Sequence, residues 1–165
     1  DNIQAGFDAT EYFIKKGCSR IAFIGGTKKL FVTQDRLTGY EQALQEHNLP
    51  LDNHRTFFAD EFLEEKGCNF SKQLFKYDPQ TDAIITTDSL LAEGVCNYLN
   101  EHQLDVPVLS FDSVNPRLNL AAYVDINSLA LGRTSFETIL QIINDVKENR
   151  QICYRQVIAH EIVEK

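Results

Sequence analysis

Short runs of apolar residues alternate along the chain with segments in which apolar positions recur every three or four residues. The runs have the length of buried strands, and the periodic segments have the pattern of amphipathic helices. Strands that alternate with helices predict an α/β fold with a parallel sheet and helices on both of its faces. We expect strands at 21–24, 56–58, 83–86 and 106–111 and helices at 2–16, 35–48, 89–102 and 128–147.

Residues with special backbone or capping preferences support this division. Gly17 is expected to end the first helix in a left-handed conformation. Asp60 and Asp88 are expected to cap the helices that follow the second and third strands. Two further extended segments, at 120–126 and 154–163, complete the predicted pattern.

Composition restricts the class of protein. The 165 residues suit one domain, and no apolar run approaches the roughly 18 residues that a membrane span needs. The chain opens directly on a helical pattern, so we expect no secretory signal and a cytoplasmic location. Its net charge is −8, and its largest basic clusters are the pairs at 15–16 and 28–29. Direct contact of this chain with nucleic acid is therefore not expected.

The cysteine and histidine positions predict neither disulfides nor a metal site. Cys18, Cys68, Cys96 and Cys153 lie far apart and form no C-x-x-C pair. We expect reduced, mostly buried thiols. The four histidines show no ligand spacing, so no metal or other cofactor is expected.

Residues suited to binding a sugar follow the four predicted strands. They are Arg36, Phe62, Thr87 with Asp88, and Asp112. A guanidinium can give paired hydrogen bonds to hydroxyls, a carboxylate can accept from two vicinal hydroxyls, and an aromatic face can lie on sugar C–H groups. Because ligands of open α/β sheets bind at the carboxyl ends of the strands, these residues predict a small-molecule site.

Each of these residues also has a purely structural interpretation. Arg36 would suit a surface position paired with Asp35, and Asp88 is as good a helix cap as a ligand contact. Phe62 would suit ordinary core packing, and Asp112 a turn. Their arrival at one sheet edge is what favours a shared binding role.

A glycine pair follows the first strand, and the sequence shows no catalytic motif. Gly25 and Gly26 lack the spacing of a phosphate-binding loop, and we expect them to form a tight turn that brings the loop close to a ligand. No G-x-S-x-G motif is present, and the carboxylates Asp88 and Asp112 make a poor glycosidase pair. The chain is not expected to be an enzyme.

Motifs with a recognisable order run along nearly the whole chain, in the stretches 1–2, 5–6, 9–12, 17–26, 35–40, 82–96, 106–113 and 131–132. In these motifs and in their order, the chain resembles the effector-binding region of the LacI/GalR family of sugar-responsive transcriptional repressors.

The resemblance implies a periplasmic-binding-protein-like fold with a sugar effector, maltose or a related saccharide, in a cleft between two subdomains. It assigns sugar contacts to Arg36, Phe62, Thr87, Asp88 and Asp112. Many family members carry Asn at the position of Thr87, so this residue is a departure that bears on affinity or sugar choice.

The resemblance also implies a division of the chain. Residues 17–122 and 153–165 would form the carboxyl-terminal subdomain, and 1–16 and 123–152 would supply helices of an otherwise missing amino-terminal subdomain. The helix-turn-helix of the family is absent, so operator DNA would be contacted only through a part outside this chain. The resemblance also implies a homodimer that has no contact with a membrane. The competing hypotheses are a sugar-binding transport receptor and a small α/β enzyme.

Overall fold

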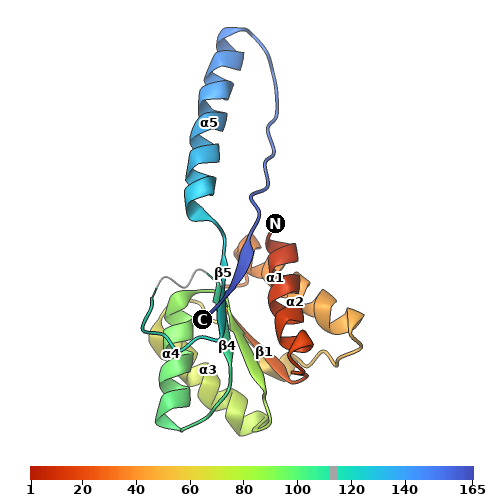
Figure 1. The fold of residues 1–165 in the computed structure, drawn as a ribbon, viewed down its shortest axis with the longest axis vertical. Coiled ribbons are helices and arrows are strands. Elements are labelled where there is room, and N and C mark those ends of the chain that lie inside the picture. Colours follow the sequence, from red (N-terminus) through yellow and green to blue (C-terminus); the bar gives the residue numbers. More distant parts are fainter. Residues whose placement is uncertain (112–114) are drawn as a thin grey trace.

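The computed structural model describes residues 1–111 and 115–165, and these form one α/β body from which a helical arm rises (Figure 1). The elements are α1 (Asn2–Lys15), β1 (Ile21–Gly25), α2 (Phe31–Glu46), η1 (Asn53–Arg55), β2 (Thr56–Phe58), α3 (Glu64–Tyr77), β3 (Ala83–Thr86), α4 (Ser89–Glu101), β4 (Val108–Phe111), β5 (Ala122–Asp125), α5 (Ser128–Lys147) and β6 (Glu161–Glu164).

The described residues build a six-stranded sheet in the order β2-β1-β3-β4-β5-β6. Neighbours from β2 to β5 pair in parallel, and β6 pairs antiparallel with β5. The predicted α/β class is confirmed, with one antiparallel edge strand added. All carboxyl ends from β1 to β5 therefore lie at one edge of the sheet, which we call the carboxyl edge.

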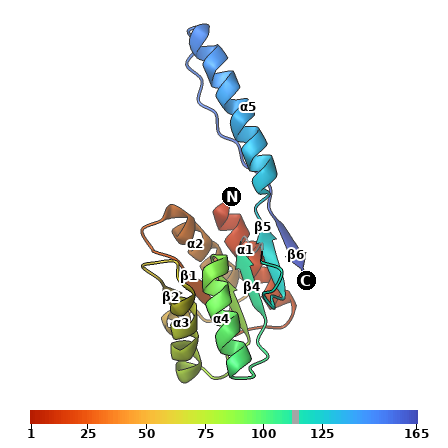
Figure 2. The ribbon, with the colours of Figure 1, turned by 90° about the vertical axis from the view of Figure 1, so that its left-hand side faces the viewer.

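Most predicted elements are confirmed, and the differences have local causes. β4 begins at Val108 rather than at 106, because Pro107 has no N–H to give to the sheet. β6 covers only part of 154–163, since the chain before it runs along the arm (Figure 2). The expected Asp60 cap is wrong. α3 starts beyond it, and the Asp60 carboxylate pairs with Lys66 at 2.7 Å instead.

Helices cover both faces of the sheet because successive residues of a strand point to opposite sides. In β1, Phe23 packs in a core with α1 and α2, while its neighbour Ile24 packs in a second core with α3 and α4. All five residues of β1 are buried, as a central strand covered on both faces requires.

Two glycines let α1 and α2 approach closely. A Cβ on Gly6 would lie 2.9 Å from the Cα of Arg36, and a Cβ on Gly39 would lie 2.5 Å from the backbone N of Phe7. Side chains at either glycine would push the helices apart, and with them Arg36.

This packing corrects the expected division of the chain at its first helix. We expected 1–16 to belong to a missing subdomain. Instead Ala5, Ala9 and Phe13 are fully or almost fully buried in the core that α1 shares with the sheet. The expected boundary at 122/123 also falls inside β5, which pairs along its length with β6.

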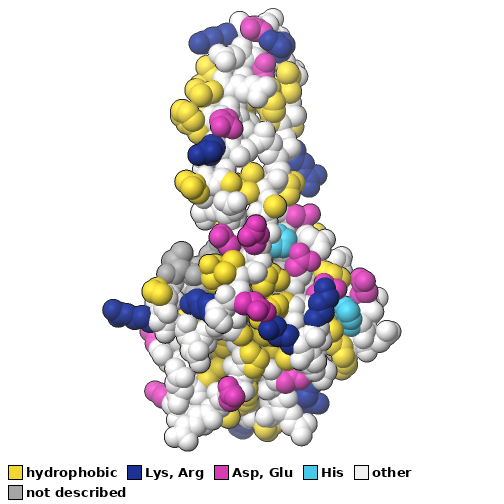
Figure 3. Space-filling model, viewed as in Figure 1, with side chains coloured by type: hydrophobic (Ala, Val, Ile, Leu, Met, Phe, Trp, Pro, Cys, Tyr) yellow, Lys and Arg dark blue, Asp and Glu magenta, His cyan; other side chains and the backbone are white. Residues whose placement is uncertain are grey.

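α5 and the chain that returns from it form the arm, which rises from the carboxyl edge (Figures 1 and 2). Within α5 only Asp145 is buried. Apolar side chains lie along the outside of the arm, where Figure 3 shows them in yellow. Those of α5 that are exposed are Leu129, Leu131, Phe136, Ile139, Leu140, Ile142, Ile143 and Val146.

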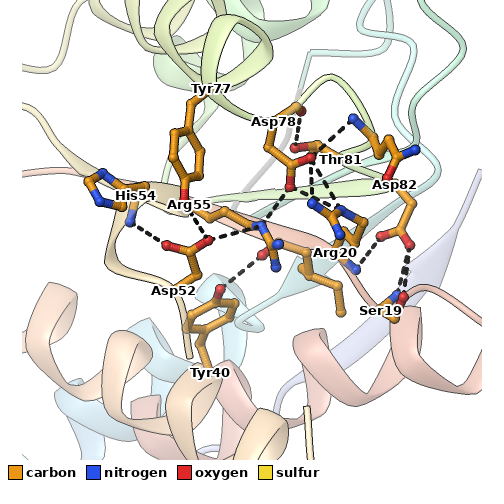
Figure 4. A network of polar contacts seen from close by, with 12 residues as sticks. Ser19, Arg20, Tyr40, Asp52, His54, Arg55, Tyr77, Asp78, Thr81 and Asp82 are labelled. Carbon is orange, nitrogen blue, oxygen red and sulfur yellow. Dashed lines mark hydrogen bonds and ion pairs between the residues drawn. The ribbon is translucent and has the colours of Figure 1, made fainter. Parts of the chain in front are cut away.

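An ionic cluster joins the amino ends of three strands at the opposite edge (Figure 4). The buried carboxylate of Asp78 accepts from Arg20 Nη2 and from Arg55 Nε, each at 2.8 Å. Asp82 accepts from the backbone N–H groups of Ser19 and Arg20 at 2.8 and 2.9 Å. These contacts tie the entries to β1, β2 and β3 together.

The charge of Asp78 is maintained by its donors. Burial alone would raise the pKa of this carboxyl group. The hydrogen bonds from Arg20, from the Gln80 N–H and from Arg55 outweigh burial and hold the pKa below its ordinary value.

We expect Asp78→Ala to lower the free energy of unfolding at pH 7 by about 3 kcal/mol, because it leaves the buried Arg55 guanidinium without its closest carboxylate. The folded-state pKa is depressed, so this stabilisation is present above about pH 4 and is lost as the pH falls further. Urea denaturation at several pH values measures both effects. Exposed Asp105→Ala is the control, and equal losses in the two variants would contradict the role of the cluster.

Candidate functional site

The carboxyl edge brings together four of the five residues that the sequence nominated. Arg36 lies on α2, which follows β1, and Phe62 lies in the loop between β2 and α3. Thr87 and Asp88 join β3 to α4. The fifth residue, Asp112, directly follows β4 and lies outside the described residues.

Arg36 is held in the middle of this group. Its side chain is buried, its Nη1 donates to the backbone oxygen of Thr87 at 2.9 Å, and its Cζ lies 4.0 Å from the centroid of the Phe111 ring. The interpretation of Arg36 as a surface residue is therefore wrong. A guanidinium clamped between a carbonyl and an aromatic face has a defined orientation before any ligand arrives.

Thr87 connects three segments of the site. Its Oγ1 accepts from the Gly26 N–H at 2.9 Å and lies 3.3 Å from Asp88 Oδ2, to which it donates. Its carbonyl accepts from Arg36. The hydroxyl and the carbonyl of this buried residue are therefore both hydrogen-bonded within the protein. The geometry indicates that Thr87 orders its neighbours.

Asp88 is the N-cap of α4, as the sequence predicted. Its Oδ1 accepts from the Leu90 and Leu91 N–H groups at 3.1 and 3.0 Å. Burial raises the pKa of Asp88, and the hydrogen bonds from Leu91, Thr87 and Leu90 offset this only in part. Asp88 is therefore a partly buried carboxylate whose charge is costly at neutral pH.

Phe62 is 39% exposed, so ordinary core packing does not describe it. Part of its ring rests on Gly26, where a Cβ would lie 2.5 Å from Phe62 Cζ. The chain turns just after Gly25 and Gly26, where the Leu30 N–H donates to the Thr27 oxygen at 3.2 Å. Neither glycine has a positive φ, and the approach of this loop to a ligand stays a prediction.

The sequence did not single out Phe111 as a member of this group, and it placed Gly26 near a ligand without its contact to Phe62. Strand alternation could have placed Phe111 on the face that α2 covers, because it ends β4 in the same core as Phe23. The contact between Gly26 and Phe62 had no signal in the sequence, since the two residues belong to loops after different strands.

An open cavity of about 570 Å³ adjoins Arg36, where the body meets the base of the arm. Asp35 and Arg36 line it from α2, Leu131 from α5, and Arg155 and His160 from the returning chain. His160 Nε2 lies 2.9 Å from Asp8 Oδ2 and so links this returning segment to α1. The cavity is rich in groups that can bond hydroxyls or carboxylates.

Within 1–111 and 115–165, no group of three or more His, Cys, Asp or Glu side chains is placed to hold a metal ion. All four cysteines are free. Cys96 is buried, and burial raises the pKa of its thiol to about 11. Cys153 is exposed, so the expectation of mostly buried thiols is met only in part.

The mostly parallel sheet, with polar residues gathered at its carboxyl edge, defines an α/β protein of the periplasmic-binding-protein-like class. The model of the periplasmic binding protein-like domain family matches residues 10–162. The chain belongs to this family, in the form found in the effector-binding region of LacI/GalR-family transcriptional regulators.

Relatives of known name support this membership. The chain is 81% identical over its full 165 residues to the HTH-type transcriptional regulator MalR of Streptococcus pneumoniae. It is 27% identical to the HTH-type transcriptional regulator RegA of Clostridium saccharobutylicum. It spans about half the length of each of these regulators, 50% and 51%.

Solved structures share the fold. A putative LacI transcriptional regulator from Bacillus cereus subsp. cytotoxis superposes with a TM-score of 0.88 at 29% identity, covering all of this chain and 60% of that one. A CelR–cellobiose complex has a TM-score of 0.81 at 23% identity, over 99% of this chain and 51% of that one, which shows the fold alone.

No described helix is both long and apolar enough to cross a membrane.

Two substitutions at Asp88 separate its capping role from ligand contact. Asp88→Ala should cost about 1 kcal/mol of stability through loss of the cap. Asp88→Asn should be neutral or slightly stabilising at pH 7, because asparagine caps as well and carries no buried charge. The folded-state pKa of Asp88 is raised, so its favourable contribution exists below about pH 4 and is lost as the pH rises.

Thermal denaturation across pH 3–8 measures these differences. If Asp88→Asn destabilised the protein as much as Asp88→Ala at pH 7, the capping geometry would be wrong. If Asp88→Asn keeps full stability, the cap does not need the charge of the carboxylate.

Proposed function

We propose that this chain is the effector-binding part of a transcriptional repressor that controls a sugar-utilisation operon. Its effector is maltose or a related saccharide. The observation that carries the proposal is the convergence of Arg36, Phe62, Thr87 and Asp88 at the carboxyl edge of a sheet with the LacI/GalR fold. The high identity to MalR favours a regulator over a transport receptor or an enzyme.

The proposed contacts divide by chemistry. Arg36 would donate to sugar hydroxyls, and the carboxylates of Asp88 and Asp112 would accept from them. Phe62 would lay its exposed ring on an apolar sugar face. Thr87 would act mainly by ordering these groups, since its hydroxyl already bonds Gly26 and Asp88.

The proposed response depends on a second wall of the cleft. The arm carries an apolar helix that is exposed within the described structure, and it stands on the side where the sugar would bind. In the intact regulator α5 would pack into an amino-terminal subdomain. Sugar that binds the closed arrangement more tightly would shift the subdomains and so the DNA-binding region. A cytoplasmic homodimer that contacts operator DNA outside this chain fits this scheme.

Calorimetric titration with maltose tests the need for the second wall. The 165-residue chain should bind maltose weakly or not at all, because it offers one side of the cleft, whereas the intact regulator should bind it. A panel of mono- and disaccharides in a thermal-shift screen identifies the preferred sugar, since a ligand of the native state raises its stability. Micromolar binding by the chain alone would contradict the two-wall arrangement.

Arg36→Lys in the intact regulator should abolish or strongly weaken the response to sugar and leave operator binding intact. Lysine keeps the charge but loses the planar contact with Phe111 and the paired donors. Arg36→Ala should have the same effect with added loss of stability, as the Thr87 carbonyl loses its donor. Operator binding with and without maltose is the measurement, exposed Arg117→Lys is the control, and normal induction in Arg36→Lys would refute the assignment.

A further inference from the structure

Gly26 is the surface on which the Phe62 ring rests. A Cβ at Gly26 would lie 2.5 Å from Phe62 Cζ, well inside the roughly 3.5–4.0 Å at which carbon atoms make favourable contact. The two residues follow β1 and β2, which are neighbours in the sheet. Any side chain at position 26 would therefore displace the ring or the loop that carries it.

The backbone at position 26 gives no other reason for glycine. Its φ is not in the left-handed region that side chains avoid, in contrast to the φ of +90° at Gly17. The N–H of Gly26 bonds to Thr87 Oγ1 at 2.9 Å, a bond that alanine would also make. The missing side chain thus serves the approach of the ring rather than the turn.

We infer that Gly26, anchored by Thr87, is a positioning residue that fixes the Phe62 ring as a platform for an apolar sugar face. The inference rests on the proposed function, because it takes Phe62 as a ligand contact. Phe62 packs on Gly26 with part of its ring and keeps 39% of its surface exposed. A ring that is ordered before binding loses less entropy when the sugar arrives.

Thr87 makes this platform part of the same unit as the hydrogen-bonding side of the site. Its hydroxyl holds the Gly26 backbone, and its carbonyl holds the Arg36 guanidinium. Thr87 therefore links the aromatic platform to the guanidinium. A substitution at Gly26 moves the ring and leaves the Arg36 contacts in place.

The first experiment measures the position of the Phe62 ring without any sugar. Nuclear Overhauser contacts between the α-protons of Gly26 and the ring protons of Phe62 are expected in the 165-residue protein. Gly26→Ala should abolish or weaken them while the amide at 26 stays bonded to Thr87. Gly132→Ala is the matched control, because a Cβ there meets nothing within 4 Å, and it should change nothing at Phe62. An unchanged ring position in Gly26→Ala overturns the inference.

The second experiment measures maltose binding in the intact regulator. Gly26→Ala should weaken binding by about threefold to tenfold, the scale of one aromatic contact. Phe62→Ala should weaken it at least as much, and Gly26→Ala should then have no further effect, because no ring remains to be displaced. Equal effects of Gly26→Ala in the presence and absence of the Phe62 ring overturn the positioning role, as does wild-type affinity in Gly26→Ala. If the unmodified regulator binds no sugar, the proposed function fails. The first experiment still decides whether Gly26 fixes the position of the Phe62 ring.

Discussion

The close approach of α1 and α2 is the constraint on which the site depends. Gly6 lies against the backbone of Arg36, and Gly39 lies against the backbone of α1, so at these two points the backbones of the helices approach each other directly. This contact brings α2 down onto the sheet, where the Arg36 side chain can reach Phe111 and the Thr87 carbonyl. A single methyl group at either glycine would lift the guanidinium away from both, which is why the first helix is part of the site's support.

The two edges of the sheet have different tasks that follow from their electrostatics. At the amino edge, Asp78 is buried among donors that outweigh its desolvation, so ionisation there stabilises the fold. At the carboxyl edge, burial dominates at Asp88, so its charge is a cost. Charge that the fold does not need is typical of a site that serves a ligand. The amino edge thus holds the strands in register, whereas the carboxyl edge carries, in the N-cap of α4, a charge that burial disfavours.

Much of the fold could be predicted because its signals are local. The four apolar runs, the Gly17 helix stop and the Asp88 cap each depend on a few adjacent residues, and each is confirmed. One local prediction failed. Asp60 was expected to cap α3, but its carboxylate pairs with Lys66 in the first turns of that helix, which begins later. The first helix was assigned to another subdomain because nothing in its own sequence tells which surface its apolar stripe will cover.

The sequence by itself determined which residues stand at the strand ends, and hence the candidates Arg36, Phe62, Thr87 and Asp88 at one edge. That follows from strand periodicity and the shared direction of parallel strands, both of which are properties of the local chain. Only the tertiary structure decided what each residue does there. Whether the Thr87 hydroxyl is open or engaged, and whether Gly26 serves a turn or a ring, depends on loops that are distant in sequence and meet only when the sheet is assembled.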